Sequence, residues 1–385
     1  MIYIHIPFCR SFCTYCDFYS EVASRCGGKG DQMVQQYAEA LVAEVQSRFE
    51  TFSAGSISDS VNTLYIGGGT PSVLPLSVFS AIVSALQSAG HKGSYDEFTI
   101  EVNPDDIVEK GEAYVEGLLE LGVNRISMGV QSFDDGILRW MNRRHDSAAA
   151  KKAYAILESA GVSNISVDLI FGLSQLSDDS WRDTLDRALE ISPSGDLPKH
   201  ISSYQLSVEP GSALASLVDR GEWMEASEEL CARQYEMLCS ALASAGYEHY
   251  EISNFALPGY RARHNSAYWS HDHYLGLGPG AHGFLGDRRY WNNPDLDAYV
   301  KAARSGDFES VRGFEILTPE QMVLERIMLG LRTADGVSED FLRTHCQAAA
   351  LSRALDSGDL ISCGSSLRIP ESRFFISDSI ISELV

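Results

Sequence analysis

The sequence predicts an α/β fold with a parallel sheet, followed by a small C-terminal domain that is rich in helices. Short β-branched runs alternate with segments of helical periodicity, which is typical of right-handed β-α-β units. The run 167–171 is almost continuously apolar and indicates a strand buried on both faces. Unusual glycine and polar residues follow several of these strands, where parallel folds place their binding sites.

Six strands and six main helices are expected in the first part of the chain. The strands are residues 2–6, 61–66, 98–102, 124–130, 164–171 and 200–208. The helices are residues 33–49, 76–88, 113–121, 147–160, 180–191 and 225–245. A glycine triplet follows the second strand, Asn103-Pro104 follows the third and Gln131-Ser132 follows the fourth.

The pattern changes beyond residue 255. Residues 256–313 are rich in glycine, histidine and aromatic residues and predict a loop-rich extension. Helical periodicity resumes at residues 320–331 and 339–356, and two short strand-like runs follow at 367–369 and 374–376. We therefore predict three parts, 1–255, 256–313 and 314–385, the last of winged-helix type with a boundary near Phe314.

Composition excludes several classes of partner. The 385 residues hold 30 Lys+Arg and 53 Asp+Glu, a net charge of −23, which repels nucleic acids and anionic membranes. The uncharged run 60–91 contains three consecutive glycines and two prolines, so no membrane span is expected. The start Met-Ile-Tyr-Ile-His-Ile-Pro has no basic region of a secretory signal, and we expect a cytoplasmic protein.

Three of the eight cysteines lie within eight residues, at Cys9, Cys13 and Cys16. Zinc would require a fourth ligand, and no second cysteine or histidine pair follows at a suitable distance. Three thiolates suit a [4Fe–4S] cluster with one iron open to a small molecule. Aromatic residues that would shield the cluster are Phe8, Phe12, Tyr15 and Phe18. The single cysteines are interpreted as small buried hydrophobic residues: Cys26, Cys231, Cys239, Cys346 and Cys363.

Candidate binding residues follow the strands. Gly67, Gly68 and Gly69 would let a ligand approach the backbone closely, and Thr70 adds a hydroxyl. Glu101 could accept hydrogen bonds from hydroxyl or ammonium groups. Gln131, Arg143 and Asp168 are candidates by the same reasoning. The alternative for each residue is an ordinary turn, a strand-end hydrogen bond or a salt bridge.

The Cys-x3-Cys-x2-Cys spacing behind a first strand, with Gly-Gly-Gly-Thr-Pro after the second, resembles the radical S-adenosylmethionine (SAM) enzymes. The resemblance covers residues 1–300 and implies a partial (β/α)6 barrel. It implies that SAM chelates the open iron and is cleaved by an electron from the cluster to give a 5′-deoxyadenosyl radical.

Further phrases are similar to the oxygen-independent coproporphyrinogen III oxidase-like group: residues 3–9, 101–104, 129–133, 168–172 and 250–255. This similarity implies SAM contacts at Tyr3, Gly68, Gly69, Thr70, Glu101, Gln131, Arg143 and Asp168, with Tyr15 along the adenosine. The true dehydrogenases carry a fourth cysteine two residues after the third, where this sequence has Phe18, and an N-terminal extension that is absent before Cys9. Both differences resemble the haem chaperone branch of the group.

The segment His264-Asn265-Ser266-Ala267-Tyr268-Trp269 is similar to the HNxxYW motif of that branch. Imidazole is a good haem ligand, and His264 is the candidate. The alternative is a structural histidine in an anchored loop. Rival ligands are His249, His271, His273 and His282.

The resemblance predicts a haem chaperone that holds a [4Fe–4S] cluster with SAM and lacks coproporphyrinogen dehydrogenase activity. Its partners would be haem, acceptor haemoproteins and an electron donor. The alternative function is a radical oxidase or decarboxylase of coproporphyrinogen III or another tetrapyrrole. A third is a radical methyltransferase or RNA-modifying enzyme, which the net charge disfavours.

Overall fold

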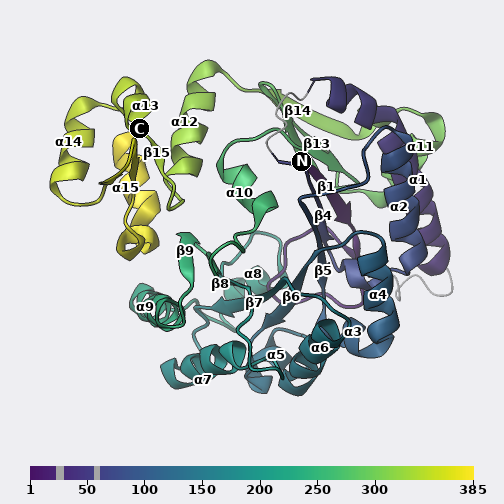
Figure 1. Cartoon of the computed structure of the whole chain (residues 1–385), viewed down its shortest axis with the longest axis horizontal. Helices are drawn as coiled ribbons and strands as arrows, with labels where there is room; N and C mark the ends of the chain where they lie inside the picture. Colours follow the sequence, from purple (N-terminus) through teal and green to yellow (C-terminus); the bar gives the residue numbers. More distant parts are fainter. Residues whose placement is uncertain (23–29, 56–60) are drawn as a thin grey trace.

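A nine-stranded sheet forms the centre of the computed structural model, which describes residues 1–22, 30–55 and 61–385 (Figure 1). Its strand order is β11-β1-β4-β5-β6-β7-β8-β10-β9. All neighbours from β11 to β8 are parallel, and β10 and β9 continue the sheet antiparallel. The predicted α/β class with a parallel sheet is therefore confirmed.

The six predicted strands are present, with small shifts. They are β1 (Ile2–Ile6), β4 (Thr63–Gly68), β5 (Glu97–Val102), β6 (Arg125–Gln131), β7 (Ile165–Phe171) and β8 (His200–Gln205). The last of these ends at Gln205 rather than at residue 208, because Gln205 pairs with Phe171, the final residue of β7. The closing strands are β9 (Glu248–Glu251), β10 (Asn254–Ala256) and β11 (Leu275–Leu277).

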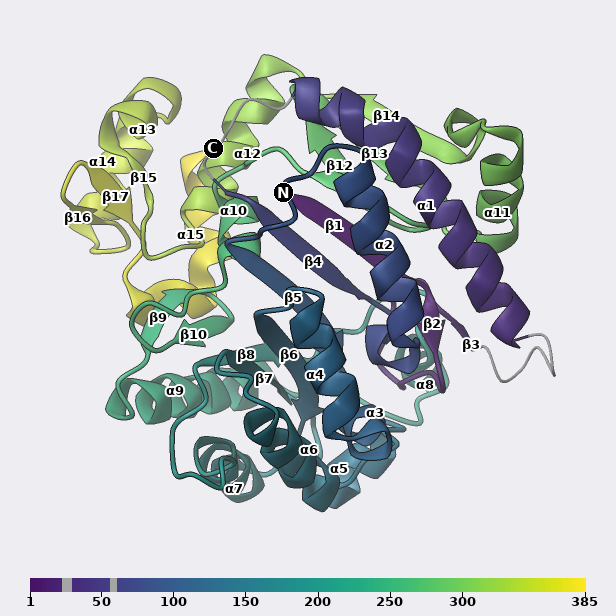
Figure 2. The ribbon, with the colours of Figure 1, turned by 45° about the vertical axis from the view of Figure 1, so that its right-hand side comes forward.

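Helices cover the outer face of the sheet, and Figure 2 shows α1, α2 and α4 in front of the first strands. The central strands bury side chains such as Ile4, Ile66 and Val167 completely. Several helices begin at a side chain that accepts from the first-turn amides: Asp134 caps α5, Asp146 caps α6 and Ser177 caps α7. The helices up to β9 are α1 (Gly30–Gly55), α2 (Leu76–Ser88), α3 (Pro104–Lys110), α4 (Glu112–Glu120), α5 (Asp135–Trp140), α6 (Ser147–Ser159), α7 (Asp178–Leu189), α8 (Ala213–Asp219) and α9 (Glu228–Ser244).

The expected loop-rich extension at residues 256–313 contains regular structure. It holds α10 (Arg263–Trp269), β11, β12 (His282–Leu285), β13 (Arg288–Asn292) and α11 (Leu296–Ser305). Strand β11 joins the main sheet beside β1, so the extension belongs to the same core. The predicted boundary near Phe314 falls inside β14 (Arg312–Ile316), where Phe314 pairs with Tyr290 of β13. The helical C-terminal part begins after it, at α12 (Pro319–Gly330).

The elements that follow α12 pack beside it and against the end of the main sheet (Figure 1). Phe374 lies edge-on to His249 of β9, with ring centroids 4.9 Å apart, and Arg261 pairs with Asp335 at 3.1 Å. Its elements are β15 (Val337–Ser338), α13 (Glu339–His345), α14 (Ala348–Asp356), β16 (Ile361–Cys363), β17 (Ser366–Arg368) and α15 (Ser377–Leu384).

Three expectations for this part are wrong. Residues 374–376 form no strand: they end a 3₁₀ helix, Glu371–Ile376, which turns Phe374 inward. Residues 339–356 form two helices, because the extended backbone at Cys346 lets both pack on one core. Cys363 is exposed on β16, whereas Cys231 and Cys346 are buried as expected; Cys26 lies outside the described residues.

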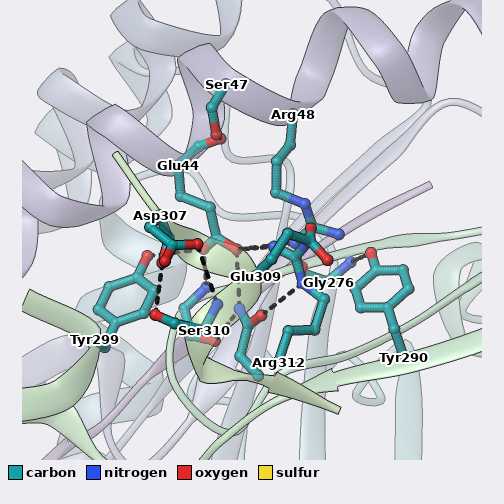
Figure 3. A network of polar contacts seen from close by, with 12 residues as sticks. Glu44, Ser47, Arg48, Gly276, Tyr290, Tyr299, Asp307, Glu309, Ser310 and Arg312 are labelled. Atoms are coloured by element: carbon teal, nitrogen blue, oxygen red, sulfur yellow. Dashed lines mark hydrogen bonds and ion pairs between the residues drawn. The ribbon is translucent and has the colours of Figure 1, made fainter. Parts of the chain in front are cut away.

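A buried carboxylate joins α1 to the segment that carries β11 to β14 (Figure 3). Glu44 has no exposed surface, and its oxygens accept from Asn292 Nδ2 at 2.9 Å, Gly278 N at 2.9 Å and Tyr299 OH at 2.7 Å. Arg48 of the same helix lies 2.8 Å away, and Arg312 of β14 lies 3.6 Å away. Two cations and three hydrogen-bond donors therefore compensate the removal of this charge from water.

We expect Glu44→Ala to lower the free energy of unfolding by about 3–5 kcal/mol, because it leaves the largely buried Arg48 and three buried hydrogen-bond donors without their acceptor. Denaturant unfolding measures this loss. Glu39→Gln on the exposed side of the same helix is the control, with an expected change of at most about 0.5 kcal/mol. Equal stability of the two variants would contradict the assigned role of Glu44.

Candidate functional site: a cavity lined by three cysteines

A cavity of about 430 Å³ opens at the carboxyl ends of the parallel strands. This is the edge at which α/β folds place their ligands, and the volume lies in the usual range for small-molecule sites. Of the predicted site residues, all except Tyr3, Gly67 and His264 line it: Cys9, Cys13, Tyr15, Cys16, Gly68, Gly69, Thr70, Glu101, Gln131, Arg143 and Asp168. The fold thus brings together residues that are far apart in the sequence.

The cysteine loop is fastened to the end of α5. The Thr14 amide donates to Met141 O at 3.1 Å, and its hydroxyl donates to Trp140 O at 2.8 Å. Asn142 Nδ2 donates to Phe12 O at 2.6 Å. The last carbonyls of a helix have no partner within the helix, so they are available to hold such a loop. These contacts hold the loop that carries the three thiols against the barrel.

Two of the thiols have polar partners in the cavity wall. Cys9 Sγ lies 3.4 Å from Thr70 Oγ1, and Arg143 Nη1 donates to Cys13 Sγ at 3.4 Å. Arg143 is held in place by hydrogen bonds of 2.7 Å to Asn103 Oδ1 and to Gly129 O. A fixed guanidinium beside the thiols offsets the negative charge of thiolates.

The donor set fits a [4Fe–4S] cluster. Within the described ranges, no three His, Cys, Asp or Glu side chains converge closely enough to hold a single metal ion. Cluster thiolates each bind a different iron, so they lie farther apart than the ligands of one ion. Burial raises the pKa of the Cys9 thiol and raises that of Cys16 to about 12, so cluster insertion must displace protons from both.

The glycine triplet allows the loop after β4 to pack closely against the cysteine loop. Its loop amides donate within the protein, from Gly69 N to Ile6 O at 2.8 Å and from Thr70 N to Phe8 O at 2.7 Å. A Cβ at Gly69 would lie 2.7 Å from Phe8 O and 3.1 Å from Cys9 Sγ, so only glycine fits beside the cysteine loop. The Gly69 and Thr70 amides are therefore already engaged within the protein.

Two buried carboxylates form the inner wall. Glu101 accepts from Tyr65 OH at 2.7 Å and from Gly68 N at 3.1 Å. Asp168 accepts from Ser127 Oγ at 2.9 Å and from Ser166 Oγ at 3.2 Å. Burial raises the pKa of Asp168 and raises that of Glu101 to about 7. Near neutral pH, Glu101 therefore exchanges between a donor and an acceptor.

Gln131 reaches the cavity through an irregular strand end. The pairing of β6 with β7 shifts register between Gly129 and Gln131, and Gln131 has a φ of 68°. Such a bulge re-aims the side chain that follows it. A Cβ at Gly129 would lie 2.9 Å from Gln131 Nε2, so the glycine makes room for this side chain.

Sequence reasoning missed several wall residues. Arg125 is buried at the start of β6 and lines the cavity, as do Ser127 and Asn265. A basic residue at a strand position expected to be buried was the signal that could have identified Arg125. Asn103 belongs to the 101–104 motif of the sequence analysis, but its role in holding Arg143 depends on a contact across the barrel.

Tyr3 and His264 lie elsewhere. The Tyr3 hydroxyl forms a hydrogen bond of 3.0 Å with His5 Nδ1. Tyr3 lines a different cavity. His264 has no exposed surface: its Nδ1 lies 2.8 Å from Thr63 Oγ1 and its Nε2 lies 3.0 Å from Tyr268 OH. With both ring nitrogens engaged, His264 cannot ligate haem iron in this conformation, and the geometry matches the structural alternative.

The comparisons with known proteins agree with this site. Residues 3–188 match the model of the Radical SAM superfamily. The solved coproporphyrinogen III oxidase (HemN) from Escherichia coli has the same fold, with a TM-score of 0.81 at 20% identity over 99% of this chain and 89% of its own. Fold and site together define a radical SAM protein, and [4Fe–4S] and SAM are the cofactors of this class.

Two curated relatives identify the family within that class. The heme chaperone HemW of Lactococcus lactis is 35% identical over 87% of this chain and 82% of its own length. The heme chaperone HemW of Bacillus subtilis is 34% identical over 88% and 84%. The chain belongs to the HemW family.

We expect Cys13→Ala to lose the cluster, because two thiolates do not hold three irons of a cubane. Iron and acid-labile sulfide per chain, measured after anaerobic reconstitution, report the loss. Cys363→Ala, which removes an exposed thiol far from the loop in sequence, should retain wild-type iron. Full iron content in Cys13→Ala would contradict the assignment.

The pKa of Glu101 predicts a pH dependence. Below pH 7 the carboxyl is protonated, and above it the carboxylate can accept from the ammonium or ribose hydroxyls of SAM. SAM affinity should therefore rise, by about tenfold at most, between about pH 6 and 8. Three neighbours also act on the pKa of Glu101: Tyr65 and Arg125 lower it, and Asp168 raises it.

Equilibrium binding of SAM to the reconstituted protein tests this expectation. Glu101→Gln should bind about tenfold or more weakly and show a flat profile over the same pH range. Glu112→Gln, on the exposed surface of α4, is the control. An unchanged pH profile in Glu101→Gln would exclude Glu101 as the titrating group.

Proposed function

We propose that this protein is a haem chaperone that binds haem and delivers it to acceptor haemoproteins, with a [4Fe–4S] cluster and SAM in its barrel. The observation that carries the proposal is the identity of 34–35% with proteins named heme chaperone HemW over nearly the whole length of both chains. The likeness to HemN, at 20% identity, supports the fold alone.

Each part of the site has a role under this proposal. When bound, the cluster and SAM would supply one-electron chemistry, or their binding would set the conformation of the barrel. Cys9, Cys13 and Cys16 hold the cluster, and Arg143 neutralises part of its charge. Glu101, Gln131 and Asp168 orient the amino-acid and ribose parts of SAM by hydrogen bonds. Of the four aromatic residues expected to shield the cluster, the buried Phe8 and the partly buried Tyr15 can exclude water from one side, whereas Phe12 and Phe18 are exposed.

The position of Phe18 separates this protein from a dehydrogenase. It stands at the position where the coproporphyrinogen III dehydrogenases carry a fourth cysteine. Its side chain is 64% exposed. An exposed phenylalanine beside the cluster offers contact area to an apolar ligand rather than a thiol to it. This observation favours the chaperone over an oxidase or decarboxylase of coproporphyrinogen III.

The cellular setting follows from the same residues. We infer a cytoplasmic protein, because three unpaired cysteines that must hold iron require a reducing compartment. Among the described residues, none of the helices has both the length and the apolar character needed to cross a bilayer. An electron donor would be a further partner if the cluster changes its oxidation state.

Haem titration of the anaerobically reconstituted protein tests the proposal. We expect a saturable Soret change at one haem per chain, and no conversion of coproporphyrinogen III when SAM and a reductant are supplied. A Soret change that grows linearly without saturation would refute the chaperone. Turnover of coproporphyrinogen III above the rate of Cys13→Ala would favour the oxidase.

A further inference from the structure

A second cavity, of about 400 Å³, adjoins the cysteine loop. It shares Asp17 and Phe18 with the first cavity, so both border the same turn of the chain. Its other walls come from β1, from α10 and from the segment between β11 and α11. The function described above assigns nothing to this space.

The walls of the second cavity are mainly aromatic. The aromatic side chains that line it are Tyr3, Phe18, Tyr19, Tyr268, Tyr274 and Trp291. Flat apolar ligands are held by such surfaces, because ring faces and edges supply large contact areas at little cost in conformational entropy. A planar macrocycle suits these walls better than a flexible ligand.

One histidine of this cavity has unoccupied ring nitrogens. His282 is exposed at the start of β12, with its ring roughly parallel to that of Trp291 at 29° and 6.1 Å between centroids. Across the part of the chain that the structure describes, no hydrogen-bond partner contacts it. His5, by contrast, has Tyr3 OH at 3.0 Å and Tyr19 O at 2.8 Å on its two nitrogens.

The protonation state of His282 suits metal ligation. Burial and the nearby Arg289 lower its pKa below the usual value, so the neutral imidazole predominates at pH 7. A neutral imidazole nitrogen is the form that binds haem iron. The geometry of the cavity and the charge state of His282 therefore agree.

We propose that haem binds in this second cavity, with His282 as an axial ligand of the iron and the porphyrin against the aromatic walls. The inference rests on the proposed haem chaperone function and names the site that the function requires. It replaces His264, whose nitrogens are both engaged.

The HNxxYW segment then acquires a structural role. His264 is buried between Thr63 of β4 and Tyr268, and its hydrogen bond orients Tyr268, which lines the second cavity. Asn265, the next residue, lines the first cavity. One short helix therefore contributes a side chain to each cavity, and His264 is a positioning residue for the haem wall.

Haemin titration of the anaerobically reconstituted protein, with SAM present, tests the site through three variants. His282→Ala should weaken haem binding at least tenfold and alter the Soret band, and added imidazole should restore the wild-type spectrum. Trp291→Ala should weaken binding while the spectrum of the bound haem stays unchanged. His273→Ala is the matched control from the same segment: it lies outside the cavity lining and should bind like wild type.

The outcomes separate this inference from the function beneath it. Wild-type protein without saturable haem binding refutes the haem chaperone itself. Saturable wild-type binding with an unchanged titration and spectrum in His282→Ala overturns the site alone. Iron and sulfide contents equal to wild type in each variant show that the cluster site and the fold are intact.

Discussion

The buried carboxylate of Glu44 is the interaction on which the arrangement of the second cavity depends. A charge without exposed surface is strongly unfavourable unless it is paired and hydrogen-bonded, and Glu44 finds its partners on segments more than 200 residues away. These contacts seat residues 276–312 against α1. The same segment supplies β11 beside β1, and with it Gly280, His282, Trp291 and Asn292 in the wall of the second cavity.

The barrel places several charges in a water-poor interior. Glu101, Asp168 and Arg125 lie on neighbouring strands, where hydrogen bonds from Tyr65 and Ser127 replace part of the lost hydration. Such charges interact strongly because little water screens them. Their grouping around the cavity, away from the apolar core that holds the sheet together, is typical of a binding site.

A shared fold does not decide between a haem chaperone and an oxidase. Local differences between the two proteins bear on that choice. The structure of HemN superimposes well at low identity, so the barrel alone fits more than one activity. The residues of the proposed haem site are peripheral to the barrel: Phe18 on the cysteine loop, Tyr268 on α10 and the pair of His282 and Trp291. That proposed site depends on how the 256–313 segment of this chain is packed.

The sequence by itself determined the six parallel strands, the cysteine triplet and part of the cavity lining. Strand periodicity is a local property, and the carboxyl ends of parallel strands must meet at one edge, so motifs at those ends converge without further information. The resemblance of the short motifs added Tyr3 and the expected position of Tyr15 along the adenosine. The sequence also defined the HNxxYW segment, though not the direction in which each of its side chains points.

Only the tertiary structure decided which histidine is free and where the chain's later segments pack. The same imidazole is a ligand or a buried hydrogen-bonding group according to its neighbours, and those neighbours come from distant parts of the chain, as Thr63 does for His264. The division of residues 339–356 at Cys346, the placement of β11 beside β1 and the sharing of Phe18 by two cavities likewise depend on long-range packing. Contacts between segments far apart in sequence leave no periodicity in either segment.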